Sequence, residues 1–445
     1  MIHSNLFISN FKKVIAIVLT FGVLVAACHT LDYLFVREDD FGRIVWHSFY
    51  NQDKNIDNLF VGSSHVYCDI NPFALGDING QNNFNLSVGN MRLNSAYYAI
   101  REANKYNDLS NVVLELYYDT LIGDMGNYHS VTTVPSAWIS LDYMKNSINK
   151  VEFLWTLSEK GQYIDSIFRF TRFREHLFDT DYIAHTVQTK QSEDYKNYKY
   201  KIEDELGTVE FLDNGYGYTT RVLQENQRLY RSLNTISADN LITEDAKCYL
   251  RKIIEYCKAE SIQITLTVSP IYELQTIAAG DYDLYYNQIA QIAGEYSVPF
   301  YDFNLCKEEY LDIQHSEYFM DTGHLNATGA KIYTKVLWSI LSEDNSQNRQ
   351  KFYNSFEEKK QAEEAQTFGL SCYANGSNLA LFVISNRYGA SNYTVSATTT
   401  NGDSREILRN DSSNYFEVPA DEHGILSIQV VQNETNESQC MDIEY

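Results

Sequence analysis

The sequence predicts an α/β fold with a parallel sheet, joined to a small all-β sandwich domain and preceded by a transmembrane helix. Short apolar runs alternate with helix-length amphipathic segments between residues 56 and 342, which is typical of a parallel sheet. Beyond residue 366 the pattern changes to short β runs separated by turn residues. Before residue 37 lies one long apolar segment. The predicted organisation is a cytoplasmic N-terminus (1–11), an anchor or signal (12–36), an α/β domain (37–342) with an insertion (121–235), a linker (343–365) and a β-sandwich (366–445).

The N-terminal apolar segment, Phe11 to Val36, is long enough to span a bilayer. Lysines precede it and acidic residues follow it, so the N-terminus is expected to stay inside while the rest is exported. We favour an uncleaved anchor, because the apolar character persists past any cleavage point. Cleavage by a signal peptidase, or a lipid on Cys28 in the lipobox-like Val25-Ala-Ala-Cys28, is also open. All three fates place residues 40–445 outside the cytoplasm.

The elements of the α/β domain follow from the period of the apolar residues. Thr243 is a plausible N-cap for one helix, because two acidic residues follow it in the first turn. Residues 121–235 interrupt the alternation of strands and helices, and they predict a mainly helical insertion over one edge of the sheet. Within them, the polar stretch 188–206 predicts a flexible or surface segment. The predicted strands are 56–61, 84–88, 111–118, 262–268 and 298–303, and the predicted helices are 94–104, one beginning at Thr243, 282–296 and 328–341.

The last segment predicts a β-sandwich from short β runs that are separated by Asn-Gly, Asp-Ser-Ser and His-Gly turns. Cys372 and Cys440 bracket this segment and could form a disulfide in an oxidising compartment. The predicted runs are 379–385, 393–398, 415–418 and 425–431.

Composition excludes several classes of function. The 445-residue chain has a net charge of -24 and no basic cluster, so we expect no nucleic-acid partner. The same acidity disfavours tight docking to anionic lipid surfaces. The seven cysteines include no Cys-x-x-Cys pair, so we predict no metal site and no cofactor. The 35 tyrosines would suit stacking on sugar rings, although tyrosine is also a common strand residue.

Two stretches carry the residue types of nucleophilic catalysis. Gly62-Ser63-Ser64 follows an apolar strand, and the carboxyl edge of a parallel sheet is where α/β folds place their sites. Asp321 and His324 lie three residues apart in a loop before a helix, where one turn can present both side chains. A serine hydroxyl needs a base to take its proton, and that base needs a carboxylate to fix its tautomer. The Gly-x-Ser-x-Gly elbow of ordinary α/β hydrolases is absent.

Together these stretches resemble the SGNH/GDSL hydrolase superfamily, in particular its membrane-anchored extracytoplasmic branch of proteins similar to DltD, AlgJ and AlgX. The resemblance covers about 56–120 and 236–342 and implies a three-layer fold. It implies Ser64 as the nucleophile, His324 as the base and Asp321 as its partner. It also implies an oxyanion hole from the backbone N–H groups of Ser64 and of Gly89, which follows Asn85-Leu-Ser-Val, with Asn90 beside it.

One departure from the family pattern concerns the third strand. Many members carry Gly-x-Asn-Asp there, and the asparagine helps to bind the oxyanion. Here the strand runs into Glu115-Leu-Tyr-Tyr-Asp119, so Asn90 or Tyr118 would have to assist.

The resemblance implies a membrane-tethered serine esterase or O-acyltransferase that acts on acetyl or similar groups of a cell-surface or secreted polysaccharide. His65, Tyr118 and Arg172 are candidate substrate-lining residues, and a structural role is open for each. The alternative is a non-catalytic accessory protein that keeps the fold and binds a glycan or a membrane-bound O-acyltransferase.

Overall fold

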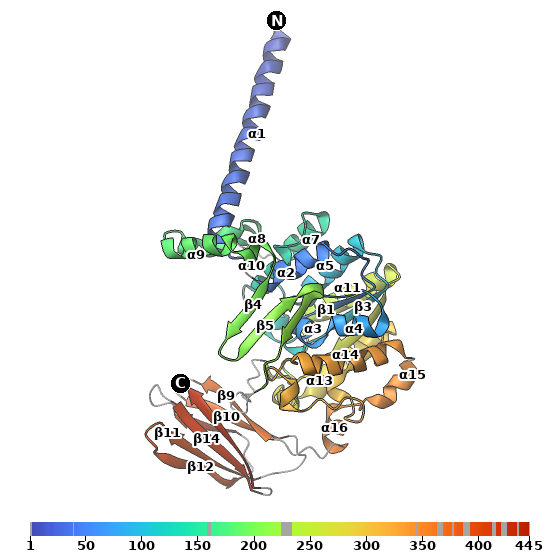
Figure 1. Cartoon of the computed structure of the whole chain (residues 1–445), viewed down its shortest axis with the longest axis vertical. Coiled ribbons are helices and arrows are strands. Elements are labelled where there is room, and N and C mark those ends of the chain that lie inside the picture. The colour runs from blue at the N-terminus through green and yellow to red at the C-terminus, as the bar shows by residue number, and fades with distance from the viewer. Residues whose placement is uncertain are drawn as a thin grey trace.

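The computed structural model has a long N-terminal helix that projects from an α/β body, with a β module beyond that body (Figure 1). It describes residues 2–38, 40–157, 162–223, 234–343, 345–362, 368–375, 378–385, 392–411, 415–419, 425–433 and 436–444.

The body is built on a parallel sheet of five strands in the order β2-β1-β3-β7-β8. The chain passes from β1 to β2 on one side and then returns to place β3 on the other side of β1. This reversal creates a switch point between β1 and β3, where open α/β sheets bind their ligands. The predicted α/β class is thus confirmed. The strands are β1 (Asn58–Gly62), β2 (Asn83–Ser87), β3 (Asn111–Glu115), β7 (Gln263–Val268) and β8 (Phe300–Asp302).

Helices cover both faces of the sheet. Leu59 and Val61 of β1 join one apolar core with α5, α11 and α13, while Phe60 joins a second core with α3, α4, α12 and α14. The predicted cap is present, since the Thr243 hydroxyl accepts a hydrogen bond from the Ala246 N–H at 3.2 Å. The helices are α3 (Ser64–Asp69), α4 (Pro72–Asn79), α5 (Leu93–Tyr106), α11 (Glu244–Ala259), α12 (Glu273–Ala278), α13 (Tyr282–Tyr296) and α14 (Ala327–Ser342), with short 3₁₀ turns η1 (Tyr118–Thr120), η6 (Phe303–Leu305) and η7 (Ser316–Tyr318).

The insertion is helical in its first part, as expected, but ends in a three-stranded antiparallel sheet that the sequence reading missed. Residues 200–204, read as part of a flexible or surface stretch, form its edge strand β4. Their side chains are mostly exposed, so the strand shows no apolar alternation, and backbone pairing to β5 forms it. The elements here are η2 (Asp124–Gly126), α6 (Val134–Leu141), α7 (Ile148–Leu157), α8 (Tyr163–Ile167), η3 (Arg169–His176), α9 (Thr180–Gln191), α10 (Glu193–Lys196), β4 (Tyr200–Asp204), β5 (Gly207–Leu212), η4 (Asp213–Gly215) and β6 (Tyr216–Thr219).

The C-terminal module contains two antiparallel sheets, β13-β10-β9 and β12-β11-β14-β15, with an apolar core of its own. Cys440 is a free cysteine, so the predicted bridge to Cys372 is not formed in this structure; the side chain of Cys372 itself lies outside the described residues. Before the module come α15 (Asn345–Asn348), η8 (Arg349–Lys351) and α16 (Phe356–Ala362). The strands are β9 (Phe368–Asn375), β10 (Asn378–Ser385), β11 (Tyr393–Thr399), β12 (Ser404–Asp411), β13 (Tyr415–Pro419), β14 (Ile425–Gln432) and β15 (Glu437–Glu444).

The N-terminal helix α1 (Ile2–Phe35) contains a segment, Lys13–Phe35, that is long and apolar enough to cross a membrane. A signal sequence passes the same test, so α1 is a candidate anchor or signal. A short helix, α2 (Phe41–Tyr50), follows and packs into the body through buried side chains such as Trp46.

Candidate active site

Ser64 is presented by the turn between β1 and α3. Ser63 is the N-cap of α3, and Ser64 is the first residue of the helix. Gly62 is required at the strand end because a Cβ there would lie 2.7 Å from the Cβ of Glu115. Ser64 therefore stands at the carboxyl end of β1, beside the switch point with β3.

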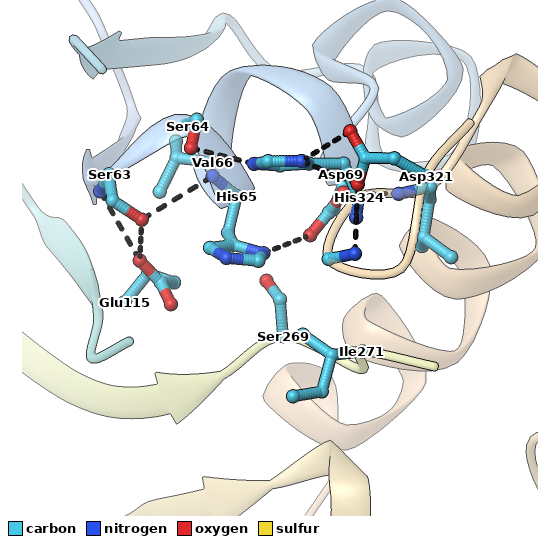
Figure 2. Close-up of polar contacts among 12 residues, drawn as sticks. Ser63, Ser64, His65, Val66, Asp69, Glu115, Ser269, Ile271, Asp321 and His324 are labelled. Atoms are coloured by element: carbon cyan, nitrogen blue, oxygen red, sulfur yellow. Dashed lines mark hydrogen bonds and ion pairs between the residues drawn. The ribbon is translucent and has the colours of Figure 1, made fainter. Parts of the chain in front are cut away.

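The structure brings Ser64, His324 and Asp321 together across 260 residues of sequence, as Figure 2 shows. The Oγ of Ser64 lies 2.7 Å from the Nε2 of His324. The Nδ1 of His324 lies 3.0 and 3.1 Å from the two carboxylate oxygens of Asp321. With Asp321 accepting the Nδ1 proton, the Nε2 of neutral His324 is free to accept the Ser64 proton.

The electrostatics of the pair follow from this contact. Burial alone would raise the pKa of Asp321, but His324 and the N–H groups of Gly323 and His324, each at 2.8 Å, lower it to about 2. Burial alone would lower the pKa of His324, but the Asp321 carboxylate raises it to about 9. Asp321 is thus charged near neutral pH, and His324 becomes an available base as the pH rises toward 9.

A second histidine–carboxylate pair lies directly against the first. The Nδ1 of His65 is 3.1 Å from Asp69, and the ring of His65 stacks on that of His324 at 4.6 Å between centroids. Burial and His324 lower the pKa of His65 to about 3, so its ring is neutral at physiological pH. Asp69 also accepts the Leu325 N–H at 2.8 Å. This carboxylate therefore ties α3, which carries Ser64, to the loop that carries His324.

Ser63 is held by Glu115 at the end of β3. One carboxylate oxygen of Glu115 accepts the Ser63 hydroxyl at 2.9 Å and the Ser63 N–H at 3.2 Å, and both residues are buried. Burial raises the pKa of Glu115, while His65 and the two bonds from Ser63 oppose that shift. The N-terminus of α3, and with it Ser64, is thereby fixed to the centre of the sheet.

We expect Glu115→Ala to lower the free energy of unfolding by about 2–4 kcal/mol, because it opens a cavity and leaves two buried Ser63 donors unpaired. Glu115→Gln keeps an acceptor oxygen and is expected to cost less. Chemical denaturation of the full chain measures both. An Ala variant that unfolds at the wild-type denaturant concentration would show that the contact contributes nothing.

The Tyr67 hydroxyl lies close to both Ser64 and Gly89. It interacts with the Ser64 side chain, and a Cβ on Gly89 would lie 3.8 Å from its oxygen. Burial raises the pKa of Tyr67 well above its ordinary value, so it remains a protonated donor. Its ring packs on Phe41 and Phe211 at centroid distances of 4.6 and 5.7 Å. Ser64, Tyr67 and Gly89 are all half-buried, which leaves this edge open to a ligand.

The other sequence-predicted residues lie apart from this cluster or inside the protein. Asn90 is exposed, in the left-handed region at φ 51°. His65 is 1% exposed and Tyr118 is 2% exposed, so neither presents a surface to a substrate. Arg172 is engaged within the insertion, where it donates to both carboxylate oxygens of Asp142 at 2.7 and 3.0 Å. The substrate-lining roles predicted for His65, Tyr118 and Arg172 are therefore not supported by their positions.

Three contributors to the site escaped the sequence reading: Asp69, Glu115 and Tyr67 in these roles. Asp69 lies four residues after His65, and Tyr67 three after Ser64, so each pair shares a face of α3. That spacing was a usable signal once a helix was assigned there. Among the described residues, no group of three or more His, Cys, Asp or Glu side chains is placed to hold a metal ion.

Comparison with known proteins adds little to this picture. No protein-family model matches the chain, and no curated protein sequence matches it. A similar solved structure is a crystal structure from Bacteroides fragilis described as a "putative acylhydrolase". It is 10% identical, with a TM-score of 0.30, over 68% of this chain and 98% of that chain. A similarity this weak carries no argument about fold or function, and both rest on the chain's own residues.

Proposed function

We propose that the protein is a serine esterase or O-acyltransferase that uses Ser64 as its nucleophile. The observation that carries the proposal is the 2.7 Å contact between Ser64 Oγ and His324 Nε2, with Asp321 at 3.0 Å on the far side of the ring. This is the arrangement that makes a serine hydroxyl reactive.

The reaction would proceed in two steps. Ser64 Oγ attacks the acyl carbonyl while His324 takes its proton, and the tetrahedral intermediate then collapses. His324 returns that proton to the departing alcohol oxygen, which leaves an acyl group on Ser64. In the second step His324 deprotonates water, for hydrolysis, or a sugar hydroxyl, for transfer. The resulting oxygen attacks the acyl carbon on Ser64, the bond from that carbon to Ser64 Oγ breaks as the new ester or acid leaves, and His324 returns the proton to Oγ.

The oxyanion of the intermediate needs donors, and three are available around Ser64. Among the described residues, no group accepts a hydrogen bond from the backbone N–H of Ser64 or Gly89. The Tyr67 hydroxyl lies beside both residues. We assign Tyr67 the role that an asparagine after the third strand has in the SGNH family, which this chain resembles.

Tyr67→Phe is expected to lower kcat about 10²-fold, the usual cost of losing one oxyanion donor, with little change in KM. The variant keeps the ring between Phe41 and Phe211, so the fold is expected to be unaffected. Steady-state kinetics on an acetyl ester test this. An unchanged kcat would remove Tyr67 from the oxyanion hole.

A polysaccharide substrate is supported by several features taken together. Asp321, His324 and Gly89 are half-buried, and a cavity of ≈ 730 Å³ lies elsewhere on the body, lined by none of these residues. The cavity wall includes Tyr195, Tyr198 and Tyr200 beside carboxylates, a mixture that suits sugar rings and hydroxyls. Phe211 lines this cavity and also packs on Tyr67. With α1 as an anchor and the remainder outside the cytoplasm, the substrate would be a cell-surface or secreted glycan.

A non-catalytic accessory role is the second candidate, and the sequence Glu115-Leu-Tyr-Tyr-Asp119 in place of an asparagine favours it. Such a protein would bind a glycan or a membrane-bound O-acyltransferase without catalysing a reaction itself.

One assay separates the two functions. The full chain is incubated in detergent with a chromogenic acetyl ester and, separately, with an O-acetylated oligosaccharide, and released acetate is measured. The enzyme is expected to release acetate from both, or to transfer it to an added glycan. No release and no transfer with either substrate would favour the accessory role.

A further inference from the structure

The helical insertion exposes large apolar side chains around the foot of α1. We call six of them the apolar collar, with exposed fractions of 79% for Ile148, 54% for Val151, 64% for Trp155, 59% for Ile164, 53% for Ile167 and 97% for Phe178. They belong to α7, α8 and the turn before α9. Figure 1 shows these helices gathered at the end of the body from which α1 leaves, with α9 running across the direction of α1.

The collar residues of α7 have the sequence spacing of one helix face. Ile148, Val151 and Trp155 are three and then four residues apart, so they share one face of α7. The opposite face is already buried in the body through Phe153 and Leu157. A helix that is apolar on both faces needs a second apolar partner, because soluble surfaces rarely leave such patches uncovered.

The insertion is fixed to α1 near the carboxyl end of its apolar segment Lys13–Phe35. The Phe170 N–H donates to the Asp32 carboxylate at 3.1 Å, and Lys190 Nζ donates to the carbonyls of Asp32 and Tyr33 at 3.1 Å. The side chains from residue 13 to residue 30 of α1 are largely exposed, whereas those from 31 to 36 are partly or fully buried, apart from Tyr33 at 44% exposed. About 20 helical residues span a hydrocarbon core of ~30 Å, so a span beginning at Lys13 ends near Asp32.

We propose that the apolar collar inserts into the outer surface of the bilayer that α1 spans. The partner is lipid at the boundary of headgroups and acyl chains, where amphipathic helices bury their apolar faces about 5–10 Å deep. The chain's net charge of -24 means that burial of apolar surface, rather than attraction to anionic lipid, drives the contact. The proposal rests on the placement of α1 as an anchor and is independent of the chemistry at Ser64. The collar would hold the body at a fixed tilt and height above the membrane.

Trp155 is a built-in probe of this contact. The full chain is reconstituted into phosphatidylcholine vesicles with brominated acyl chains, and the emission of Trp155 is taken as wild type minus Trp155→Phe. We expect that emission to fall by roughly half or more relative to unbrominated vesicles, because insertion brings the ring within reach of the bromines. Iodide added outside the vesicles is expected to quench Trp155 emission less than it does in detergent. The difference should be the same at low and at high salt, because apolar burial drives the contact.

The matched control is Tyr310→Trp in the Trp155→Phe background. Tyr310 is 39% exposed, and its ring lies beside Lys351, which follows α15. Figure 1 draws α15 far from α1. The control tryptophan is expected to respond to iodide and not to brominated lipid. Flotation of the protein with the vesicles reports anchoring separately. If the protein floats but Trp155 behaves like the control, the collar does not insert. If it does not float, the anchor and the proposal both fail, while ester turnover still tests the site.

Discussion

Ser64→Ala is expected to reduce turnover of an acetyl ester by about 10⁴-fold or more, because removing the nucleophile of such a site leaves only binding and oxyanion stabilisation. The hydroxyl is half-buried and its loss opens no large cavity, so stability should hardly change. The measurement is kcat/KM of the full chain in detergent, with the free energy of unfolding as a check on folding.

Ser63→Ala is the matched control one residue away. The Ser63 hydroxyl is buried against Glu115 and does not reach His324, so this variant is expected to lose stability while keeping most of its turnover. Equal turnover by wild type and Ser64→Ala would remove Ser64 from the mechanism. Loss of turnover in Ser63→Ala but not in Ser64→Ala would identify Ser63 as the nucleophile.

Asp321→Asn is expected to lower kcat/KM by about 10³–10⁴-fold, because a neutral amide neither fixes the His324 tautomer nor stabilises the imidazolium. It should also move the pH profile. His324 acts as a base only when neutral, so wild-type activity rises with pH through the His324 pKa of about 9. Asp321 causes that elevation, and the residual activity of the variant should therefore rise at lower pH.

The pH profile of kcat/KM for both proteins checks this, with ester hydrolysis in buffer subtracted. Asp312→Asn is a suitable control, since Asp312 pairs with exposed His315 at 2.8 Å in the same loop region. It should leave both the rate and the profile unchanged. A profile that is the same in wild type and Asp321→Asn would contradict the assignment of Asp321 as the partner of His324.

The α/β body could be predicted because its signals are local. Apolar runs marked the five strands, and the Thr243 cap and the apolar period marked α5, α11, α13 and α14. The short helices α3, α4 and α12 were not predicted, because each is too short to show an apolar period. The pairing of Asp321 with His324 could also be predicted from the sequence, because the two residues lie three positions apart on one turn. Their meeting with Ser64 came from the resemblance to a known family, because no local pattern links positions 260 residues apart.

The rest depended on tertiary contacts that leave weak marks in sequence. β4 is formed by pairing to β5 and carries almost no apolar pattern. Glu115 reads as an ordinary strand-end residue until β1 is placed beside β3, which brings it against Ser63. Arg172 looked like an anion ligand, but its guanidinium is already paired with Asp142 inside the insertion.

The most direct test of the central claim is covalent labelling of the full chain with a fluorophosphonate, followed by peptide mass spectrometry. Such probes phosphonylate a serine only when a base activates it. The account predicts one adduct on Ser64, lost in Ser64→Ala, strongly slowed in Asp321→Asn and retained in Ser63→Ala. No adduct on the folded wild-type chain, or an adduct on a different serine, would contradict it.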